Sequence, residues 1–446
     1  MMPLDPKAAA GTVSALLREV QKLDQKAEAR ASVFSARAGN TRFARNEVTT
    51  SAETDEAEVS LFVQLGRRSA VATTNQLEPE ALRALAARTF ALARIAPEDP
   101  EAMPVLGPVT PLPGAASFDA AAVKLDAAAR AEMARVSIAA AKKRDLVIAG
   151  FAEHVNGTQA LATTAGLNVQ NTVSVVGLSM TARTADGSGS GWSSGSARGP
   201  SAIDAAKLAE VACEKAALSK APKKLEPGRY TVLLEPAAAA TMLRWLVEAL
   251  DARSADEGRS FFSKKGGGSR LGEKLFNERI TLSSNPAATE TAGWTVDPEG
   301  LALPPITWVE NGVVKALQRS RFWAQKTGAK PTGEYGGYSL KAGSETFDAM
   351  LSGIERGVLI TRFWYTNSVD PQTMTITGLT RDGTFLIEKG QLVGAVNNFR
   401  FNQSVAQALA NCDALSVDAP TVGSPENRCP AMRTHEFNLA TVSEAV

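Results

Sequence analysis

The stretch LLEPAAAATMLRWLVEAL, residues 233–250, reads as a strand that runs directly into a helix. Alanine and leucine favour the helical conformation, and Leu243, Leu246, Val247 and Leu250 fall on one apolar stripe of that helix. Enzymes of the α+β class often place catalytic residues near such a junction in the middle of the chain. This helix instead carries almost none of the side chains that catalysis requires, so its stripe predicts a packing element.

The sequence on either side of this junction predicts an α+β protein. Ala-rich helices accompany strands with one polar face in the first half, and the second half is mostly strands and turns. Four dipeptides are typical of tight hairpins, namely Asn156-Gly157, Asn311-Gly312, Asp382-Gly383 and Lys389-Gly390. The charged, Pro-containing segment APKKLEPG indicates a domain boundary near residue 222. We therefore expect an N-terminal α/β domain at residues 1–221 and a β-rich C-terminal domain at residues 222–446.

Composition narrows the class of protein further. The 446 residues are 44% hydrophobic and 21% charged, which is typical of a globular protein. The 48 basic and 47 acidic residues leave a net charge of +1, so no domain-scale basic field exists to hold nucleic acid or an anionic membrane. No run approaches the ~20 apolar residues of a membrane span. The N-terminal segment lacks the features of a signal peptide, and three cysteines form no disulfide pattern, so we expect a cytoplasmic protein.

Few residues could support catalysis by this chain alone. His154 and His435 are the only histidines, which excludes any mechanism that needs three imidazoles. With only these two histidines, no hydrolase triad can be nominated. Cys429 and His435 lie six residues apart and could share a metal, but they supply only two ligands.

The glycine-rich segment GRSFFSKKGGGSRLGEK, residues 258–274, is the best candidate for ligand binding by backbone and cationic groups. It offers main-chain N–H groups together with Lys264, Lys265, Arg270 and Lys274. These groups could hold a peptide carboxylate or an acidic side chain. The alternative interpretation is a mobile surface loop.

Several motifs together resemble, in order and spacing, those of the TldD/PmbA family, also called TldD/TldE or modulator of DNA gyrase. They are RFARNEV at 42–48, PGRYTVLLEP at 227–236, EGRSFFSKKGGGSRLGEKL at 257–275 and FLIEKGQLVGAVNNFRFNQS at 385–404. The resemblance covers nearly the whole chain. It implies a bacterial, cytoplasmic peptidase system in which TldD and TldE subunits form a heterodimer that degrades small unstructured peptides. In that family TldD binds zinc through an H-E-x-x-x-H motif on the helix after a central strand and through a later cysteine.

This chain departs from the family's zinc motif. The resemblance places Arg244 at the first histidine, Trp245 at the glutamate and Ala249 at the second histidine. Arginine is a permanent cation and alanine has no donor atom, so neither can bind Zn²⁺, and tryptophan cannot accept a proton as a general base. Residues five apart lie about 140° apart on a regular helix, so a zinc helix of this type must be distorted, whereas this one is free to be regular. Cys429 lies in the region of the family's cysteine ligand.

The leading hypothesis is a non-catalytic TldE/PmbA-like subunit that is inactive alone. We expect no metal in this chain, zinc in a TldD-like partner subunit, and an unstructured peptide as substrate. Arg259, Ser260, Gly266, Gly267 and Gly268 are the residues expected to face the substrate. The isolated chain could also form a homodimer.

Two alternatives remain open at the level of sequence. One is a self-sufficient metallopeptidase with atypical ligands, which would need Cys429, His435 and a carboxylate to converge. The other is a regulator that interacts with nucleic acid or gyrase, against which the neutral net charge argues.

Overall fold

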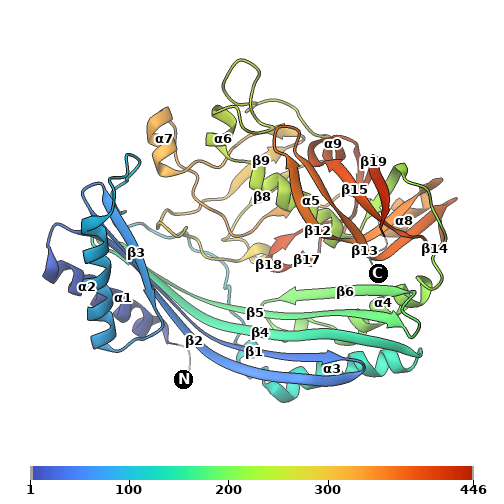
Figure 1. Ribbon diagram of the computed structural model, residues 1–446, viewed down its shortest axis with the longest axis horizontal. Coiled ribbons are helices and arrows are strands. Elements are labelled where there is room, and N and C mark those ends of the chain that lie inside the picture. The colour runs from blue at the N-terminus through green and yellow to red at the C-terminus, as the bar shows by residue number, and fades with distance from the viewer. Residues whose placement is uncertain (1–3, 444–446) are drawn as a thin grey trace.

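The structure, a computed structural model, describes residues 4–443 and confirms the α+β class (Figure 1). An N-terminal sheet with its helices precedes a mostly β C-terminal domain that begins with β7 (Gly228–Leu234) and α5 (Pro236–Ala249). The predicted junction at residues 233–250 is therefore confirmed. The predicted domain boundary falls between α4 (Ala205–Leu218) and β7 and stays a prediction, and residues 1–3 and 444–446 of the predicted domains lie outside the described residues.

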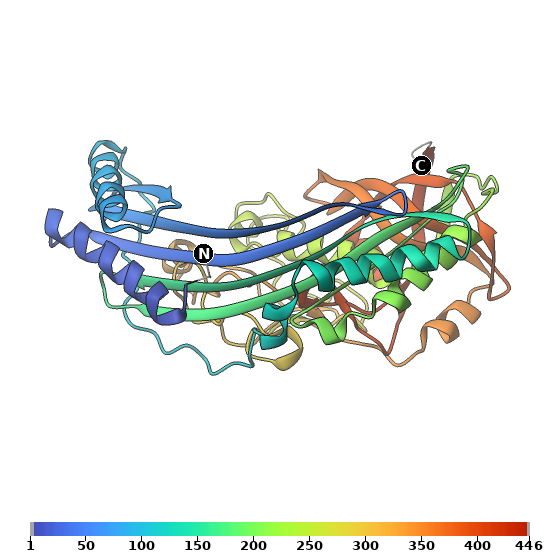
Figure 2. The same cartoon turned by 90° about the horizontal axis from the view of Figure 1, so that it is seen from below.

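The N-terminal sheet is antiparallel, with the strand order β3-β2-β1-β4-β5-β6. Its strands are β1 (Glu28–Ala44), β2 (Glu47–Leu65), β3 (Arg68–Thr74), β4 (Leu146–Thr163), β5 (Asn168–Thr184) and β6 (Ser190–Ala197). The four longest of these strands form a curved platform along one side of the molecule (Figures 1 and 2). Alternating apolar residues such as Val59, Leu61 and Val63 are fully buried on one face, as the period of two requires.

Four helices cover this sheet in two pairs. Helix α1 (Pro6–Leu23) packs against α2 (Pro79–Ile95) at one end, and α3 (Ala127–Lys142) packs against α4 at the other (Figure 2). Two separate hydrophobic clusters result, one under each pair. Within the described residues, none of the helices combines the length and the apolar character that crossing a bilayer requires.

The C-terminal domain contains a ring of five strands. They are β7, β12 (Arg356–Asp370), β13 (Thr375–Glu388), β15 (Asn398–Ser404) and β19 (Met432–Ser443), and each pairs with two others of the five so that the ring closes. Strands β14 (Gln391–Ala395) and β16 (Cys412–Leu415) are attached to it. Phe363, Phe401 and Phe437, from three strands of the ring, are buried with ring centroids 4.5 to 5.7 Å apart.

A second, shorter sheet completes the domain, with the order β10-β9-β8-β11-β18-β17. Its strands are β8 (Leu282–Ser284), β9 (Ile306–Glu310), β10 (Val313–Val314), β11 (Ser339–Leu340), β17 (Thr421–Val422) and β18 (Ser424–Arg428). The remaining helices are α6 (Ala252–Asp256), α7 (Arg321–Thr327), α8 (Phe347–Ser352) and α9 (Val405–Ala410), with short 3-10 helices at Ala120–Lys124, Pro200–Ala202 and Thr289–Thr291.

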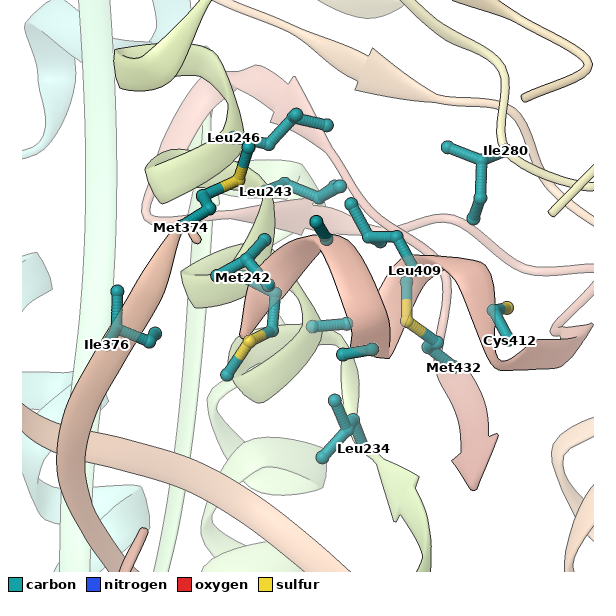
Figure 3. Packing of buried hydrophobic residues seen from close by; sticks show 14 of the residues in the cluster. Leu234, Met242, Leu243, Leu246, Ile280, Met374, Ile376, Leu409, Cys412 and Met432 are labelled. Atoms are coloured by element: carbon teal, nitrogen blue, oxygen red, sulfur yellow. The ribbon is translucent and has the colours of Figure 1, made fainter. Parts of the chain in front are cut away.

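Helix α5 packs at the centre of this domain. Figure 3 shows Met242, Leu243 and Leu246 of α5 close to Leu409 of α9 and Met432 of β19. Leu243, Leu246 and Leu250 of the predicted stripe are almost completely buried, and Val247 is partly buried. The helix is therefore the packing element that its sequence predicts.

Two of the four predicted hairpins are wrong. Asn311-Gly312 and Lys389-Gly390 do form turns with positive φ, as expected. Asn156-Gly157 instead lies inside β4, where the missing Cβ of Gly157 leaves room for the ring of Phe34. Asp382-Gly383 lies inside β13, where the Asp382 carboxylate is buried and forms ion pairs with Arg362 and Arg381.

A buried charged network fixes α3 to the N-terminal sheet. The Arg130 side chain is fully buried and its Nη1 lies 3.1 Å from Glu53 Oε1, 3.0 Å from the Leu125 carbonyl and 3.1 Å from His154 Nδ1. Because Arg130 can only donate, His154 Nδ1 must accept and the imidazole is neutral. Burial, followed by the Arg130 charge, lowers the pKa of His154 below its ordinary value of 6.5.

Stability is therefore expected to fall with acidification. Below pH 6.5 His154 binds a proton in the unfolded chain more readily than in the folded chain, because its pKa is lower in the folded chain. The stability that neutral His154 contributes to the folded state is therefore complete above pH 6.5 and is lost as the pH falls. Chemical denaturation between pH 7.5 and 5.5 should show a declining free energy of unfolding, with a weaker decline in His154→Gln. His435→Gln is the control, because that histidine lies outside the network. An identical decline in both variants would contradict this assignment.

Candidate functional site

The C-terminal end of α5 borders a cavity of about 310 Å³. Trp245 and Ala249, two of the three residues that the resemblance aligns with the zinc motif, lie in its wall. Arg259 and Ser260, which were predicted to face a substrate, line the same cavity. The other lining residues are Glu248, Asp251, Ser254, Ser368, Pro371, Met374 and Ile376. The structure thus brings the altered helix and part of the glycine-rich segment to one site.

Arg244 is turned towards the surface and is held by its neighbours. Its Nη1 lies 3.1 Å from Glu248 Oε1, its Nη2 donates to the Thr366 hydroxyl at 3.2 Å, and its guanidinium stacks 4.8 Å from the centre of the Trp245 ring. The three positions that the resemblance aligns with the zinc motif thus carry a guanidinium, an indole and a methyl group, and this donor set does not fit a zinc ion. Among residues 4–443, no group of three or more His, Cys, Asp or Glu side chains is arranged to hold a metal.

Trp245 contributes an aromatic ring to the wall of this cavity. Its ring packs against the hydrophobic cluster around α5, and its buried Nε1 has no hydrogen-bond partner among residues 4–443. Leaving such a donor unpaired in the folded protein costs roughly 1–3 kcal/mol. The indole supplies an apolar wall beside Met374 and Ile376.

Cys429 and His435 do not converge on a common ligand position. The Cys429 thiol is buried and contacts the Pro430 carbonyl at 3.3 Å, and burial strongly raises its pKa. His435 Nε2 lies 3.0 Å from Asp413 Oδ2, and its Nδ1 lies 3.0 Å from the Thr231 hydroxyl. Each side chain is therefore engaged with neighbours of its own, and Cys429 is a protonated thiol rather than a thiolate ligand.

Gly266, Gly267 and Gly268 lie outside the 310 Å³ cavity. All three have positive φ values, between 79° and 108°. Apart from the adjoining residues, no described residue has a heavy atom within 4 Å of the position that a Cβ would take. They form a tight turn in which Lys264 N donates to the Gly268 carbonyl at 2.8 Å. Their conformation requires glycine for backbone reasons, and they adjoin Lys264 and Lys265, which line a second, larger cavity.

The sequence analysis did not predict the part of the cavity wall that the β12–β13 hairpin forms. Pro371, Met374 and Ile376 reach the site from more than a hundred residues downstream of Arg259. The Phe261 N–H donates to the Pro371 carbonyl at 2.9 Å and fastens the hairpin to the glycine-rich segment. No local pattern marks these residues, because alternating apolar residues in a strand look the same whether they face a core or a cavity.

Two family models match most of the chain, and both belong to one metallopeptidase family. The PmbA/TldA metallopeptidase C-terminal domain matches residues 227–441, and the central domain of the same family matches residues 116–220. The chain therefore belongs to the PmbA/TldD metallopeptidase family, as its motifs indicated. A metalloprotease of Methanothermobacter thermautotrophicus is 26% identical over 207 residues, which is 43% of each chain, so less than half of that relative's length is matched.

Solved structures show the same fold over nearly the whole chain. TldE from Thermococcus kodakarensis has a TM-score of 0.84, and a candidate modulator of DNA gyrase from Thermotoga maritima has a TM-score of 0.83. Each is 18% identical, and each comparison covers 96% of this chain and 100% of the other. A second candidate modulator of DNA gyrase, from Bacteroides thetaiotaomicron, has a TM-score of 0.83 at 18% identity and covers 97% of this chain and 98% of its own. At this identity the likeness establishes the fold.

Proposed function

We propose that this chain is a non-catalytic, TldE-type subunit that pairs with a TldD-like zinc peptidase in the cytoplasm, and that the pair degrades small unstructured peptides. The observation that carries the proposal is the occupation of the zinc-motif positions by Arg244, Trp245 and Ala249 on an otherwise regular packing helix. A chain with these residues has neither metal ligands nor a general base at that place. Catalysis in the pair then depends on the zinc of the partner subunit.

The role of this chain in the pair is to help enclose and bind the peptide. The cavity beside α5 presents the Trp245 ring and the Met374 side chain as apolar contacts, with Arg259 and Ser260 at the same wall. Unstructured peptides of many sequences share only their main chain, so we expect main-chain pairing to a strand to supply part of the affinity. The partner's zinc site would act on a peptide held in this way.

Co-expression with a TldD-like chain tests the proposal. We expect the two chains to co-elute in size-exclusion chromatography as a stable complex, and we expect the complex, but neither this chain alone nor its homodimer, to cleave an unstructured peptide. The matched control is the same complex with the partner's H-E-x-x-x-H motif disabled, which should assemble and remain inactive. Failure to form a complex, or full cleavage by this chain alone, would refute the proposed role.

A further inference from the structure

A second cavity, of about 710 Å³, adjoins the first and is lined by cations. Its wall contains Lys264, Lys265 and Arg270 but no aspartate or glutamate, and its neutral part includes Phe261, Gln407 and several hydroxyl side chains. This local excess of positive charge contrasts with the net charge of only +1 for the whole chain. A cavity of this kind attracts an anionic ligand.

The three cations are only partly neutralised. Glu273, just outside the lining, lies 3.0 Å from Arg270 Nε and 3.5 Å from Lys264 Nζ, so one carboxylate serves two cations. The Arg270 guanidinium also stacks 4.8 Å from the Phe261 ring centre, which orients it, and its Nη groups have no hydrogen-bond partner among residues 4–443. Lys265 makes no ion pair within the same range. The cavity therefore retains a surplus of about two positive charges for a ligand.

The two cavities share a wall. Ser260 lines both of them, and the hairpin turn at Pro371 and Gln372 borders both. Two hydrogen bonds hold that turn on the glycine-rich segment, from Phe261 N to the Pro371 carbonyl at 2.9 Å and from Gln372 Nε2 to the Gly258 carbonyl at 3.4 Å. An extended ligand that crosses this contact would place one part beside Trp245 and the next part among the lysines.

We propose that the two cavities together select unstructured peptides in which an apolar side chain is followed within a few residues by acidic side chains. The apolar side chain binds beside Trp245 and Met374, and the acidic side chains bind at Lys264, Lys265 and Arg270. The inference rests on the proposed function and adds a substrate class to it. A peptide is favoured over a nucleic acid because Lys264, Lys265 and Arg270 line a single cavity, whereas a nucleic acid needs cations spaced along its phosphate backbone.

Fluorescence anisotropy with the full chain tests this selectivity. The probe is a labelled ten-residue peptide with one leucine followed by three glutamates, and its reference has glutamine in place of each glutamate. Both are amidated at the C-terminus, so only the side chains differ in charge. At low ionic strength we expect the glutamate peptide to bind about tenfold more tightly, and we expect 0.5 M salt to remove most of that preference.

Two charge-matched variants test whether the preference for the glutamate peptide arises in the cavity of 710 Å³. Lys264→Gln with Lys265→Gln should reduce the preference for glutamate to about twofold, since one paired cation remains. Lys142→Gln with Lys143→Gln removes the same charge from the exposed end of α3 and should leave the preference unchanged.

Equal affinity for the two peptides, no binding of either, an unchanged preference in the Lys264 and Lys265 variant, or tighter binding of an oligodeoxynucleotide of equal length would each overturn the inference. Complex formation with a TldD-like chain is measured separately and would still stand in each of these cases. Loss of the complex together with retained acidic selectivity would instead overturn the proposed function alone.

Discussion

Leu243→Ala is expected to lower the free energy of unfolding by about 3 kcal/mol. The Leu243 side chain is fully buried on α5, inside the cluster that joins α5 to α9 and the ring of five strands. Truncation would leave a cavity at the centre of the C-terminal domain, because the surrounding strands and helices can close it only in part. Urea denaturation followed by circular dichroism measures the change directly.

Arg244→Ala, at the neighbouring position, is the matched control for this prediction. Its side chain is exposed and its ion pair with Glu248 is of the i,i+4 surface type, which contributes little to stability. We expect a change much smaller than that of Leu243→Ala. If both variants lost the same stability, or if Leu243→Ala lost less than about 1 kcal/mol, then α5 would not be the packing element described above.

Asp382→Asn is expected to cost about 3 kcal/mol of stability. Asp382 is only 1% exposed, and its carboxylate pairs with Arg362, 3.0 Å from Nε, and lies 3.9 Å from Nη2 of Arg183 in the N-terminal sheet. Arg381 approaches it to 3.8 Å. Loss of the carboxylate charge would leave these arginines without their shared counter-ion in a partly buried place. Asparagine tolerates the positive φ of 52° at this position, so the substitution isolates the charge.

A control variant and a double variant measure how much the Asp382–Arg362 ion pair contributes to the stability of the protein. Glu132→Gln breaks an exposed pair with Arg135 on α3 and should change stability little. Combining Asp382→Asn with Arg362→Met should cost less than the sum of the two single changes, since the second substitution removes one of the uncompensated charges. Additive losses in the double variant would show that the two side chains do not interact.

Local sequence patterns predicted the parts of the fold that depend on neighbouring residues. The run from β7 into α5 was predictable because its apolar stripe and its helix-forming residues agree. The hairpins predicted at Asn156-Gly157 and Asp382-Gly383 were wrong because dipeptides that favour a turn can also make long-range contacts within a strand. Gly157 makes room for the ring of Phe34, and Asp382 pairs with Arg362. Such contacts leave no mark on the local pattern.

The candidate site was predictable only from the side that carries sequence motifs. Arg259 and Ser260 lie in the same cavity as Trp245 and Ala249, whereas their role in substrate binding stays a proposal. The part of the cavity wall formed by Met374 could not be predicted from the sequence, because it depends on how the β12–β13 hairpin packs on the glycine-rich segment. The glycine turn itself has a backbone role that its composition alone could not separate from a binding role.

Zinc content, measured by mass spectrometry of the elements, tests the central claim most directly. The chain is purified alone and as a complex with a TldD-like subunit, and both samples are dialysed under the same conditions. We expect no stoichiometric zinc in the chain alone and one zinc ion per complex, with cleavage of an unstructured peptide only by the complex and only until a chelator is added. Stoichiometric zinc in the isolated chain, together with chelator-sensitive cleavage by that chain, would contradict it.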